Sequence, residues 1–274
     1  MSGLFTLNTD FLILSFQALM LLAVVTWVFS TWLQDVSIVD YIWSLLTLLA
    51  VATYSYLSNS SGAIGPVGMG MLLMVVIWGL RLAYFLMVRG HNKPEDRRYQ
   101  VIRKRNSPNF TFKSLYLIFI FQATVAWIMS VSFVPVFDMS MEQQNNWTFW
   151  HSLGVALWLF GFIYESVADN QLHSFNRKLV TPGSTLNTGL WRYSRHPNYF
   201  GELCVWWGWC LYAVPTDSLW IIVAPLVMTY LLIKFSGVGN MEQGITDRRP
   251  DYQAYIKTTN TLIPGKPLRK VIDF

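Results

Sequence analysis

The sequence predicts an all-α protein that crosses a membrane several times. Of its 274 residues, 53% are hydrophobic and only 13% are charged, whereas a soluble domain is nearer a quarter charged. Aromatic residues reach 16%, and one water-soluble core of this size cannot bury so much apolar surface. The composition excludes a disordered chain, which needs low hydrophobicity. Two cysteines are too few for a disulfide scaffold.

Seven apolar stretches have close to the length of about 20 residues that crossing a bilayer requires. They are residues 11–32, 36–57, 67–88, 114–136, 149–168, 199–214 and 217–236. The sixth is the shortest of them. Since the sequence shows neither an internal repeat nor a low-complexity tract, we expect residues 1–274 to form a single membrane domain.

The positions of the basic residues predict the orientation of these spans. Apart from Arg81 and Lys234, all Lys and Arg residues lie in the loops 89–113 and 169–198 or in the tail 237–274. Because cytosolic loops attract Lys and Arg, these segments are expected in the cytosol and the N-terminus outside, with Lys234 as an anchor at the boundary. The net charge of +5 thus reflects membrane topology, and we expect no nucleic-acid partner.

Ionisable groups at membrane depth are costly and usually functional. Asp40, near the start of the second span, is either an interfacial acid stabilised by the helix dipole or a carboxyl group in a cavity. Burial in a cavity would keep the acid neutral, so that it could donate a hydrogen bond to a carbonyl. Arg81 and Tyr84 are three residues apart and share a helix face. Arg81 either reaches the membrane surface or pairs with a buried acid or a bound phosphate.

A second polar group occurs near the end of the fifth span. Glu165 and Asp169 are four residues apart on one helix face, and they are followed by Asn170, Gln171, His173 and Asn176. The pattern indicates either a polar pocket or a plain polar helix end. The His and Glu spacing that is typical of zinc sites is missing, so no metal is predicted. Glu202, at the start of the sixth span, either stabilises the helix dipole or belongs to a site.

The strongest local signal lies in residues 186–202. Gly189 allows a tight turn. Arg192 and Arg195 stand beside aromatic residues and suit phosphate binding and stacking on a base. Pro197 begins a helix whose free amides can receive an anion. The run therefore indicates a cytosolic anion or nucleotide site, although it contains neither a dinucleotide-binding fingerprint nor a P-loop.

The run 189–202, with Arg195-His196-Pro197-Asn198-Tyr199 at its centre, resembles the C-terminal signature of integral-membrane sterol and steroid reductases. Isoprenylcysteine carboxyl methyltransferases carry a related run. Four further segments are similar to the bacterial branch of the steroid 5α-reductase family, and the resemblance extends over most of residues 36–267. These segments are residues 37–43, 78–84 and 95–99 and the tail 248–264.

The resemblance implies a bundle of seven helices with NADPH held by the cytosolic loops and the bundle. It implies a hydrophobic, steroid-like substrate and a place in the inner membrane if the source is bacterial. The expected reaction is reduction of the Δ4 double bond of a 3-oxo steroid or a similar lipid enone. A hydride passes to the β-carbon and a proton to the α-carbon.

The resemblance also assigns residues to the two ligands. Those expected at the cofactor are Arg97, Arg98, Tyr99, Glu165, Asp169, His173, Arg192, Tyr193, Arg195, His196, Asn198, Tyr199 and Glu202. Those expected at the substrate are Asp40, Trp43, Trp78, Arg81 and Tyr84. Asp40 takes the place of the carboxyl group that holds the ketone, where the animal enzymes have Glu. Tyr84 is the nearest match to the carbonyl-polarising tyrosine, although the register could put Trp78 there, so Asp40 and Tyr84 are the expected catalytic residues.

Two other functions compete with reduction. A methyltransferase of the isoprenylcysteine type, using S-adenosylmethionine, would share the His-Pro-x-Tyr element, but Glu202 after the glycine disfavours it. A non-enzymatic lipid-binding protein or transporter is disfavoured because transporters often show repeat symmetry. The basic residues around Arg97 favour NADPH over NADH.

Overall fold

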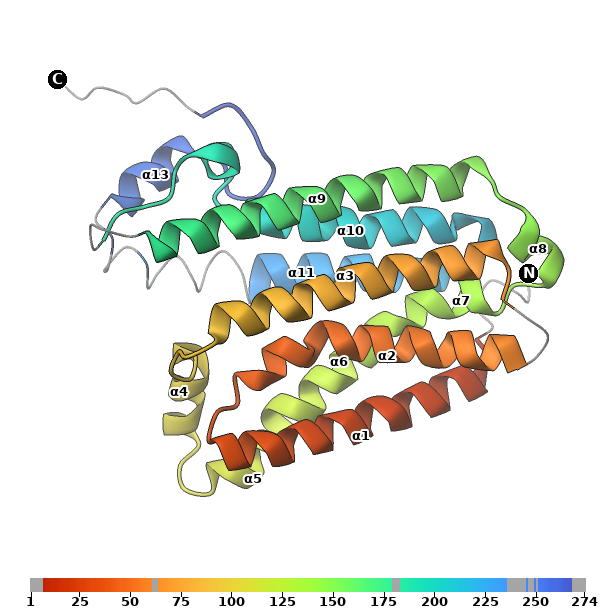
Figure 1. The fold of residues 1–274 in the computed structure, drawn as a ribbon, viewed down its shortest axis with the longest axis horizontal. Helices are drawn as coiled ribbons and strands as arrows, with labels where there is room; N and C mark the ends of the chain where they lie inside the picture. Colours follow the sequence, from red (N-terminus) through yellow and green to blue (C-terminus); the bar gives the residue numbers. More distant parts are fainter. Residues whose placement is uncertain are drawn as a thin grey trace. The chain divides into compact units, whose positions relative to one another are not determined.

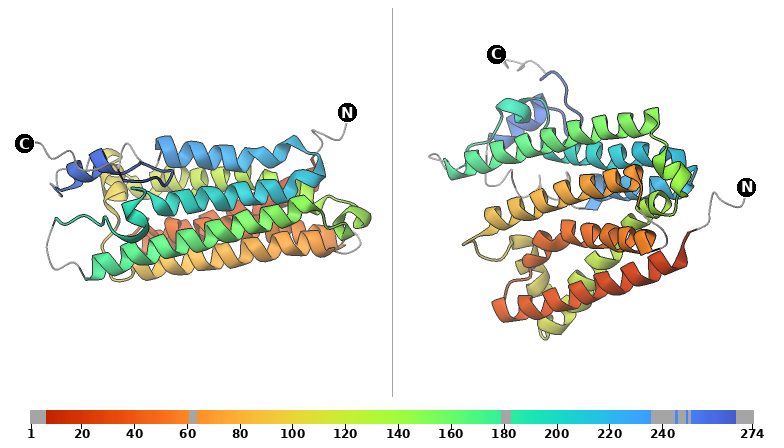
Figure 2. Two further views of the ribbon diagram at one scale, coloured as in Figure 1. Left: turned by 90° about the horizontal axis from the view of Figure 1, so that it is seen from above. Right: turned by 45° about the vertical axis from the view of Figure 1, so that its right-hand side comes forward.

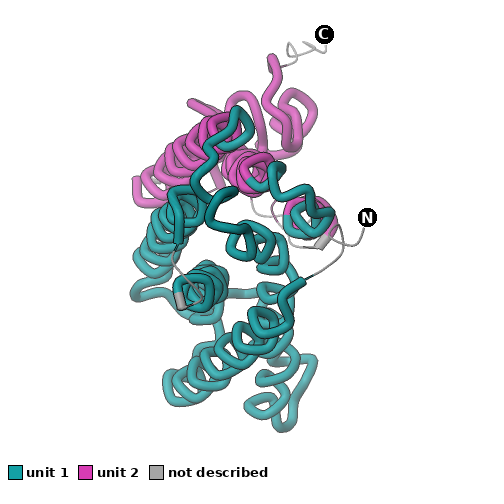
Figure 3. The backbone as a smooth tube through the Cα atoms, turned by 90° about the vertical axis from the view of Figure 1, so that its right-hand side faces the viewer, with its two compact units in different colours: residues 1–151, 213–224 teal, residues 152–212, 225–274 magenta. Residues whose placement is uncertain are grey.

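The computed structural model describes residues 7–60, 64–178, 183–235, 245, 249 and 251–267, and every regular element in these ranges is a helix. Much of the expected cytosolic tail, including Arg248, lies outside the described residues. Contacts divide the chain into two compact units, which Figure 3 distinguishes by colour. Unit 1 comprises residues 1–151 and 213–224, and unit 2 comprises residues 152–212 and 225–274.

Unit 1 is built around a central helix, α2, which packs against α1, α3 and α6. Its helices are α1 (Thr9–Leu33), α2 (Ile38–Ser60), α3 (Pro66–Gly90), α4 (Arg97–Arg105), α5 (Phe110–Ser114), α6 (Phe121–Ser130), α7 (Val134–Phe137) and α8 (Met141–Asn145). A π-helical segment, Leu115–Ile120, joins α5 to α6, so this part of the chain remains helical. Figure 1 shows α4 and α5 at one end of this unit and α7 and α8 at the other.

Unit 2 contains most of α9 (Phe149–Arg177) and α10 (Pro197–Ala213), the short helix α13 (Tyr252–Thr258) and the greater part of α11 (Val223–Tyr230). A single 3₁₀ turn, Gly189–Arg192, precedes α10. Figure 2 follows α9, in green, and α10, in blue-green, running alongside each other in both views. This pair of helices carries the second group of candidate residues.

Among the described residues, five helical stretches are long and apolar enough to cross a membrane. They are Thr9–Leu33, Ile38–Asn59, Pro66–Gly90, Phe110–Phe137 and Phe149–Arg177. These stretches match the first five expected spans and support an all-α, multi-pass membrane protein. The sixth and seventh spans also fall on helices, but α10 has 17 residues and the apolar helix Leu219–Lys234 is of similar length. Seven spans and their orientation therefore stay predictions.

Helix α9, which corresponds to the fifth expected span, is longer than the sequence predicts. From the sequence, this span is expected to end at residue 168 and a loop to begin at 169, but α9 continues to Arg177. Buried positions recur along it at intervals of three and four residues, at 151, 154, 158, 161, 165 and 168. Asp169 is buried next to them. Since the polar side chains Glu165 and Asp169 lie on a packed face, the helix has no reason to end where the apolar run ends.

Glycines bring the backbones of α9 and α10 into close contact. A Cβ atom at Gly161 would lie 2.6 Å from the carbonyl oxygen of Gly201, and one at Gly201 would lie 2.6 Å from the backbone nitrogen of Glu165. Gly154 and Gly208 make equally close approaches to Tyr212 and Trp158. Small residues at such crossings are typical of membrane helices, which gain stability from close backbone packing. The packing fixes Glu165 beside the start of α10.

We expect Gly201→Ala to destabilise the protein because the added methyl group meets backbone, which cannot rotate away. Forcing a methyl group into a packed interface costs typically about 1–3 kcal/mol. The thermal unfolding midpoint of the detergent-solubilised protein measures the effect. Gly79→Ala is the matched control, since its Cβ would meet nothing closer than Ser44 O at 3.3 Å. Equal losses in the two variants would contradict the close approach at Gly201.

Candidate functional site

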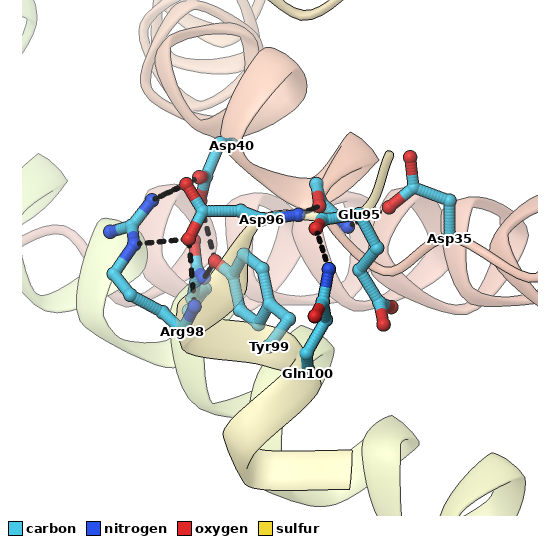
Figure 4. A network of polar contacts seen from close by, with 9 residues as sticks. Asp35, Asp40, Glu95, Asp96, Arg98, Tyr99 and Gln100 are labelled. Atoms are coloured by element: carbon cyan, nitrogen blue, oxygen red, sulfur yellow. Dashed lines mark hydrogen bonds and ion pairs between the residues drawn. The ribbon is translucent and has the colours of Figure 1, made fainter. Parts of the chain in front are cut away.

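In unit 1, a polar network surrounds Asp40 in the first turn of α2 (Figure 4). The hydroxyl of Tyr99 donates a hydrogen bond to Asp40 Oδ1 at 2.5 Å, and Arg98 Nη2 donates to Asp40 Oδ2 at 2.8 Å. Both carboxylate oxygens therefore accept hydrogen bonds, one of them from a cation. The sequence analysis expects Asp40 to act as a neutral donor, but in this geometry it is the acceptor of the network.

Tyr99 supplies the neutral O–H group of the network. Gln122 Nε2, on α6, donates to Tyr99 Oη at 3.1 Å. Because a phenol has one hydrogen, this contact leaves the O–H of Tyr99 directed at Asp40. Burial, followed by the negative charge of Asp40, raises the pKa of Tyr99 well above its usual value. Tyr99 therefore stays protonated at any physiological pH.

Arg98 and Asp96 complete this side of the network. Burial acts to lower the pKa of Arg98, but the charges of Asp40 and Asp96 outweigh it and raise that pKa. Asp96 begins α4 as its N-cap, with Oδ1 accepting the backbone N–H of Arg98 at 2.8 Å. Oδ1 also pairs with Arg98 Nε at 3.0 Å. The guanidinium is thus held between two carboxylates and stays charged.

Residues just before α4 bind the segment that joins α1 to α2. Glu95 Oε1 accepts the backbone N–H of Val36 at 3.1 Å, and the backbone N–H of Asp96 donates to Ser37 Oγ at 2.8 Å. Arg103 holds both oxygens of Glu95, at 2.9 Å through Nε and 2.6 Å through Nη2. The run 95–99 therefore anchors α4 against the start of α2 and brings Arg98 and Tyr99 to Asp40.

We expect this anchoring to weaken in acid. Burial acts to raise the pKa values of Glu95 and Asp96, but the hydrogen bonds of Glu95 to Arg103 and Val36, and of Asp96 to Arg98, hold both pKa values below the ordinary 4.5 and 3.8. A lowered pKa stabilises the fold above the ordinary value, and this stability is lost as the pH falls through the lowered one.

The thermal unfolding midpoint should therefore stay constant near neutral pH and should decrease when the pH is lowered below about 4. Glu95→Gln should lower the midpoint at pH 7 and make it less sensitive to acid. The same change at Glu142, an exposed acid on α8, is the control. An acid response that is identical in Glu95→Gln and in the parent protein would contradict the role of Glu95.

Of the residues expected at the substrate, some are packed between α2 and α3, whereas Tyr84 is exposed. Trp43 and Trp78 meet edge to face with ring centroids 6.3 Å apart, where α2 and α3 pack against each other. Trp78 is buried and Arg81 is half-buried. Tyr84, in contrast, is 71% exposed and takes no part in the network of Asp40. The tyrosine that the structure brings to Asp40 is Tyr99, which the sequence analysis assigns to the cofactor.

In unit 2, acidic and amide side chains gather on the facing sides of α9 and α10. Glu165, Asp169 and Glu202 are all buried. Asn198 Nδ2 donates to Asp169 Oδ1 at 3.3 Å, and Trp206 Nε1 donates to Glu202 Oε1 at 2.8 Å. Asn198 Oδ1 is buried without a hydrogen-bond partner among the described residues. A buried acceptor of this kind fits a ligand that brings its own N–H or O–H group.

The other residues expected at the cofactor lie around this cluster or at the nearby surface. The rings of His196 and Tyr199 stack with centroids 5.2 Å apart. His173 is half-buried on α9, and Arg192 and Tyr193 are exposed. Of the residues expected in unit 1, Arg97 is exposed at the start of α4.

Arg195 has a structural role that the sequence analysis misses. It is buried, and its Nη1 donates to the carbonyl oxygens of Thr259 at 2.8 Å and Ile256 at 3.0 Å. Tyr255 is buried on α13, and its single O–H is shared between the carbonyl oxygens of Trp191 and Ser194. These bonds hold residues 252–265 on the turn before α10. Tyr252 and Tyr255 are both buried, whereas Ile263, further along the same segment, is exposed.

Gln122 and Trp206 are two further site residues that are not expected from the sequence. Gln122 is an amide inside the apolar stretch 114–136, so a search for all polar side chains in spans, and not only for ionisable ones, would have found it. Trp206 lies one turn after Glu202, and only the structure distinguishes it from the other tryptophans of that span.

The buried acceptors of unit 2 fit the hydroxyl groups of a ribose and the carboxamide of a nicotinamide nucleotide. Three buried carboxyl groups can accept from hydroxyl groups, and Asn198 Oδ1 can accept from an amide. Exposed Arg192 and Tyr193 offer a cation and an aromatic ring for the phosphates and the base. In the described part of the chain, no group of three or more His, Cys, Asp or Glu residues is placed to hold a metal ion.

Comparison with known proteins gives a family but no activity. The model of a family described as "Protein of unknown function (DUF1295)" matches residues 26–259. A curated relative, the uncharacterized protein C594.04c of Schizosaccharomyces pombe, is 25% identical over an alignment that covers 95% of this chain and 81% of the relative. No solved structure gives a significant match.

Proposed function

Since this chain belongs to the DUF1295 family, which includes steroid 5α-reductase-like proteins, we propose that it reduces the carbon–carbon double bond of a lipid enone with NADPH. The substrate class that we propose is a 3-oxo-Δ4 steroid or a hydrophobic enone of similar shape. The observation that carries the proposal is the buried Tyr99 hydroxyl, held by Gln122 and Asp40 at the end of a membrane helix.

Reduction of an enone builds negative charge on its carbonyl oxygen. An O–H donor directed at that oxygen lowers the barrier, typically by about 3–4 kcal/mol. Tyr99 is such a donor, and its raised pKa keeps its proton in place before reaction. A ketone oxygen that replaces Asp40 Oδ1 as the acceptor receives the same O–H. In this proposal Asp40 and Arg98 position Tyr99.

The cofactor would be held by residues of unit 2. NADPH, when bound, supplies the hydride that reaches the β-carbon of the enone. Asn198 would accept from the carboxamide, Asp169 and Glu202 would accept from hydroxyl groups, and Arg192 would bind phosphate. The buried Asn198 Oδ1 supports this arrangement because an unpaired buried acceptor is costly without a ligand.

The test uses the full chain, purified in detergent. NADPH oxidation is followed with progesterone as the 3-oxo-Δ4 steroid, and the product is identified by mass spectrometry. A product heavier by two hydrogens that forms only with NADPH is the expected result. Methyl transfer from S-adenosylmethionine to a prenyl thiol would replace the proposal with the methyltransferase. Tight steroid binding without turnover would indicate a lipid-binding protein.

A further inference from the structure

A pocket of about 230 Å³ lies in unit 1 where α1 ends. Six of the residues that line it carry the argument: Ser30, Thr31, Gln34, Arg103, Thr111 and Ser114. Pockets for whole small molecules usually have volumes of about 300–1,000 Å³. This pocket is smaller, so it suits one end of a larger molecule.

The side chains around the pocket place it at the depth of lipid headgroups. Trp27 Nε1, on the last turns of α1, donates to the carbonyl oxygen of Thr111 at 2.9 Å. Trp32 is 79% exposed and Phe112 is 69% exposed, and aromatic side chains gather at membrane–water interfaces. Because α1 is a membrane-spanning candidate that ends at Leu33, the pocket lies where an apolar span meets water.

The donors and acceptors of the pocket define its ligand. Arg103 binds Glu95 and Gln34 through Nε and Nη2, which leaves both hydrogens of Nη1 without a hydrogen-bond partner among the described residues. A phosphate oxygen is the natural partner of such a group. Lys104 and Arg105 follow Arg103 in the last turn of α4, where they are exposed and add positive charge to this end of the helix.

The hydroxyl groups of the pocket present acceptors. Ser30, Thr31 and Ser114 donate to carbonyl oxygens of their own helices at 2.7–2.8 Å. Their oxygen lone pairs are therefore the groups offered to a ligand. A matching ligand carries hydroxyl donors beside its phosphate, as a glycerol phosphate does, whereas a choline headgroup has no such donors.

We propose that this pocket binds the headgroup of an anionic phospholipid whose phosphate ester carries hydroxyl groups, with phosphatidylglycerol as the model. The phosphate pairs with Arg103, the hydroxyl groups donate to the Ser and Thr oxygens, and Lys104 and Arg105 favour the anionic headgroup. Each Lys or Arg near an anionic membrane surface contributes about 1 kcal/mol to this attraction. The proposal does not depend on the reductase activity.

The experiment offers equal amounts of phosphatidylglycerol and phosphatidylcholine to the purified full chain and counts the bound lipids by native mass spectrometry. The unaltered protein should retain phosphatidylglycerol in preference to phosphatidylcholine. Thr31→Leu, which fills the pocket and leaves the Arg103–Glu95 pair in place, should weaken this retention about tenfold or more, because the larger side chain keeps the headgroup out of the pocket; a tenfold loss corresponds to about 1.4 kcal/mol. Arg103→Gln should have at least the same effect.

Thr53→Leu is the matched control. Thr53 is also half-buried and donates to a carbonyl of its own helix, Leu49 O, but it does not line the pocket. This variant should keep the preference for phosphatidylglycerol. Unchanged retention in Thr31→Leu would overturn the assignment of the pocket, and equal retention of the two lipids by the unaltered protein would overturn the anionic ligand.

A soluble phosphate could satisfy the same donors. The thermal unfolding midpoint of the delipidated protein is therefore also measured with the lipid, with glycerol 3-phosphate and with inorganic phosphate. Only the lipid should raise the unfolding midpoint at matched concentration, because its acyl chains stay in the apolar surroundings of α1. A rise of the same size with glycerol 3-phosphate would overturn the lipid as the source of the phosphate.

Discussion

Asp40→Asn should lower turnover by about 10²–10³-fold, the effect that follows the loss of one directed donor at a reacting carbonyl. The substituted amide presents N–H groups to Tyr99 Oη, where the carboxylate of the parent protein accepts the Tyr99 O–H at 2.5 Å. The phenol hydrogen is then no longer directed to the place where a ketone oxygen would bind. Arg98 also loses the carboxylate that it contacts at 2.8 Å.

The measurement separates turnover from cofactor binding. Initial rates of progesterone reduction give kcat, and NADPH-dependent thermal stabilisation gives the affinity for the cofactor. We expect kcat to fall while NADPH affinity stays within about twofold of the parent value, a change of less than about 0.5 kcal/mol. Asp35→Asn, the same chemical change just before α2, is the control. Equal losses of NADPH affinity and kcat in Asp40→Asn would contradict the proposal that Asp40 acts at the substrate.

Tyr99→Phe tests the donor itself. Since Asp40 acts through Tyr99 in this proposal, each single variant should lose nearly as much kcat as the double variant, because groups that act as a unit are not additive. Tyr84→Phe separates the two candidate tyrosines. If Tyr84→Phe abolished turnover and Tyr99→Phe did not, the donor would be the tyrosine that the resemblance assigns.

The sequence predicts the first five spans well because their signal is physical and local. Each is an apolar run of spanning length, which the sequence shows directly. The end of α9 is predicted less well, because hydropathy does not register that Asp169 is buried by packing. A buried polar face looks like a loop when only composition is considered.

The residues of the candidate site could be predicted from the sequence, but the contacts between them could not. The criterion of ionisable groups in spans finds Asp40, and the run 95–99 stands out by its charge. Tyr99 and Arg98 contact Asp40 because α4 is attached to the segment before α2. The attachment is made by hydrogen bonds of Glu95 and Asp96. These contacts join residues 59 positions apart, and no local pattern encodes such a separation.

Asn198→Leu should weaken NADPH binding about tenfold, a loss of about 1.4 kcal/mol, while leaving the protein without cofactor nearly as stable as before. The two effects have different causes. Asn198 Oδ1 is buried without a partner among the described residues, so its removal costs the cofactor-free protein nothing. Asn198 Nδ2 contacts Asp169 at 3.3 Å, and because this hydrogen bond is long, its loss should cost about 1 kcal/mol, the value typical of an ordinary hydrogen bond.

Thermal unfolding with and without NADPH measures both effects in one series. A ligand at 100 times its Kd stabilises a protein by about 2.7 kcal/mol, and tenfold weaker binding reduces this to about 1.4 kcal/mol. The NADPH-dependent rise of the unfolding midpoint should therefore fall by about half in Asn198→Leu. Asn170→Leu changes an exposed amide on α9 and should keep the full rise. If Asn198→Leu also kept it, the buried amide would have a purely structural role and the cofactor would bind through other residues.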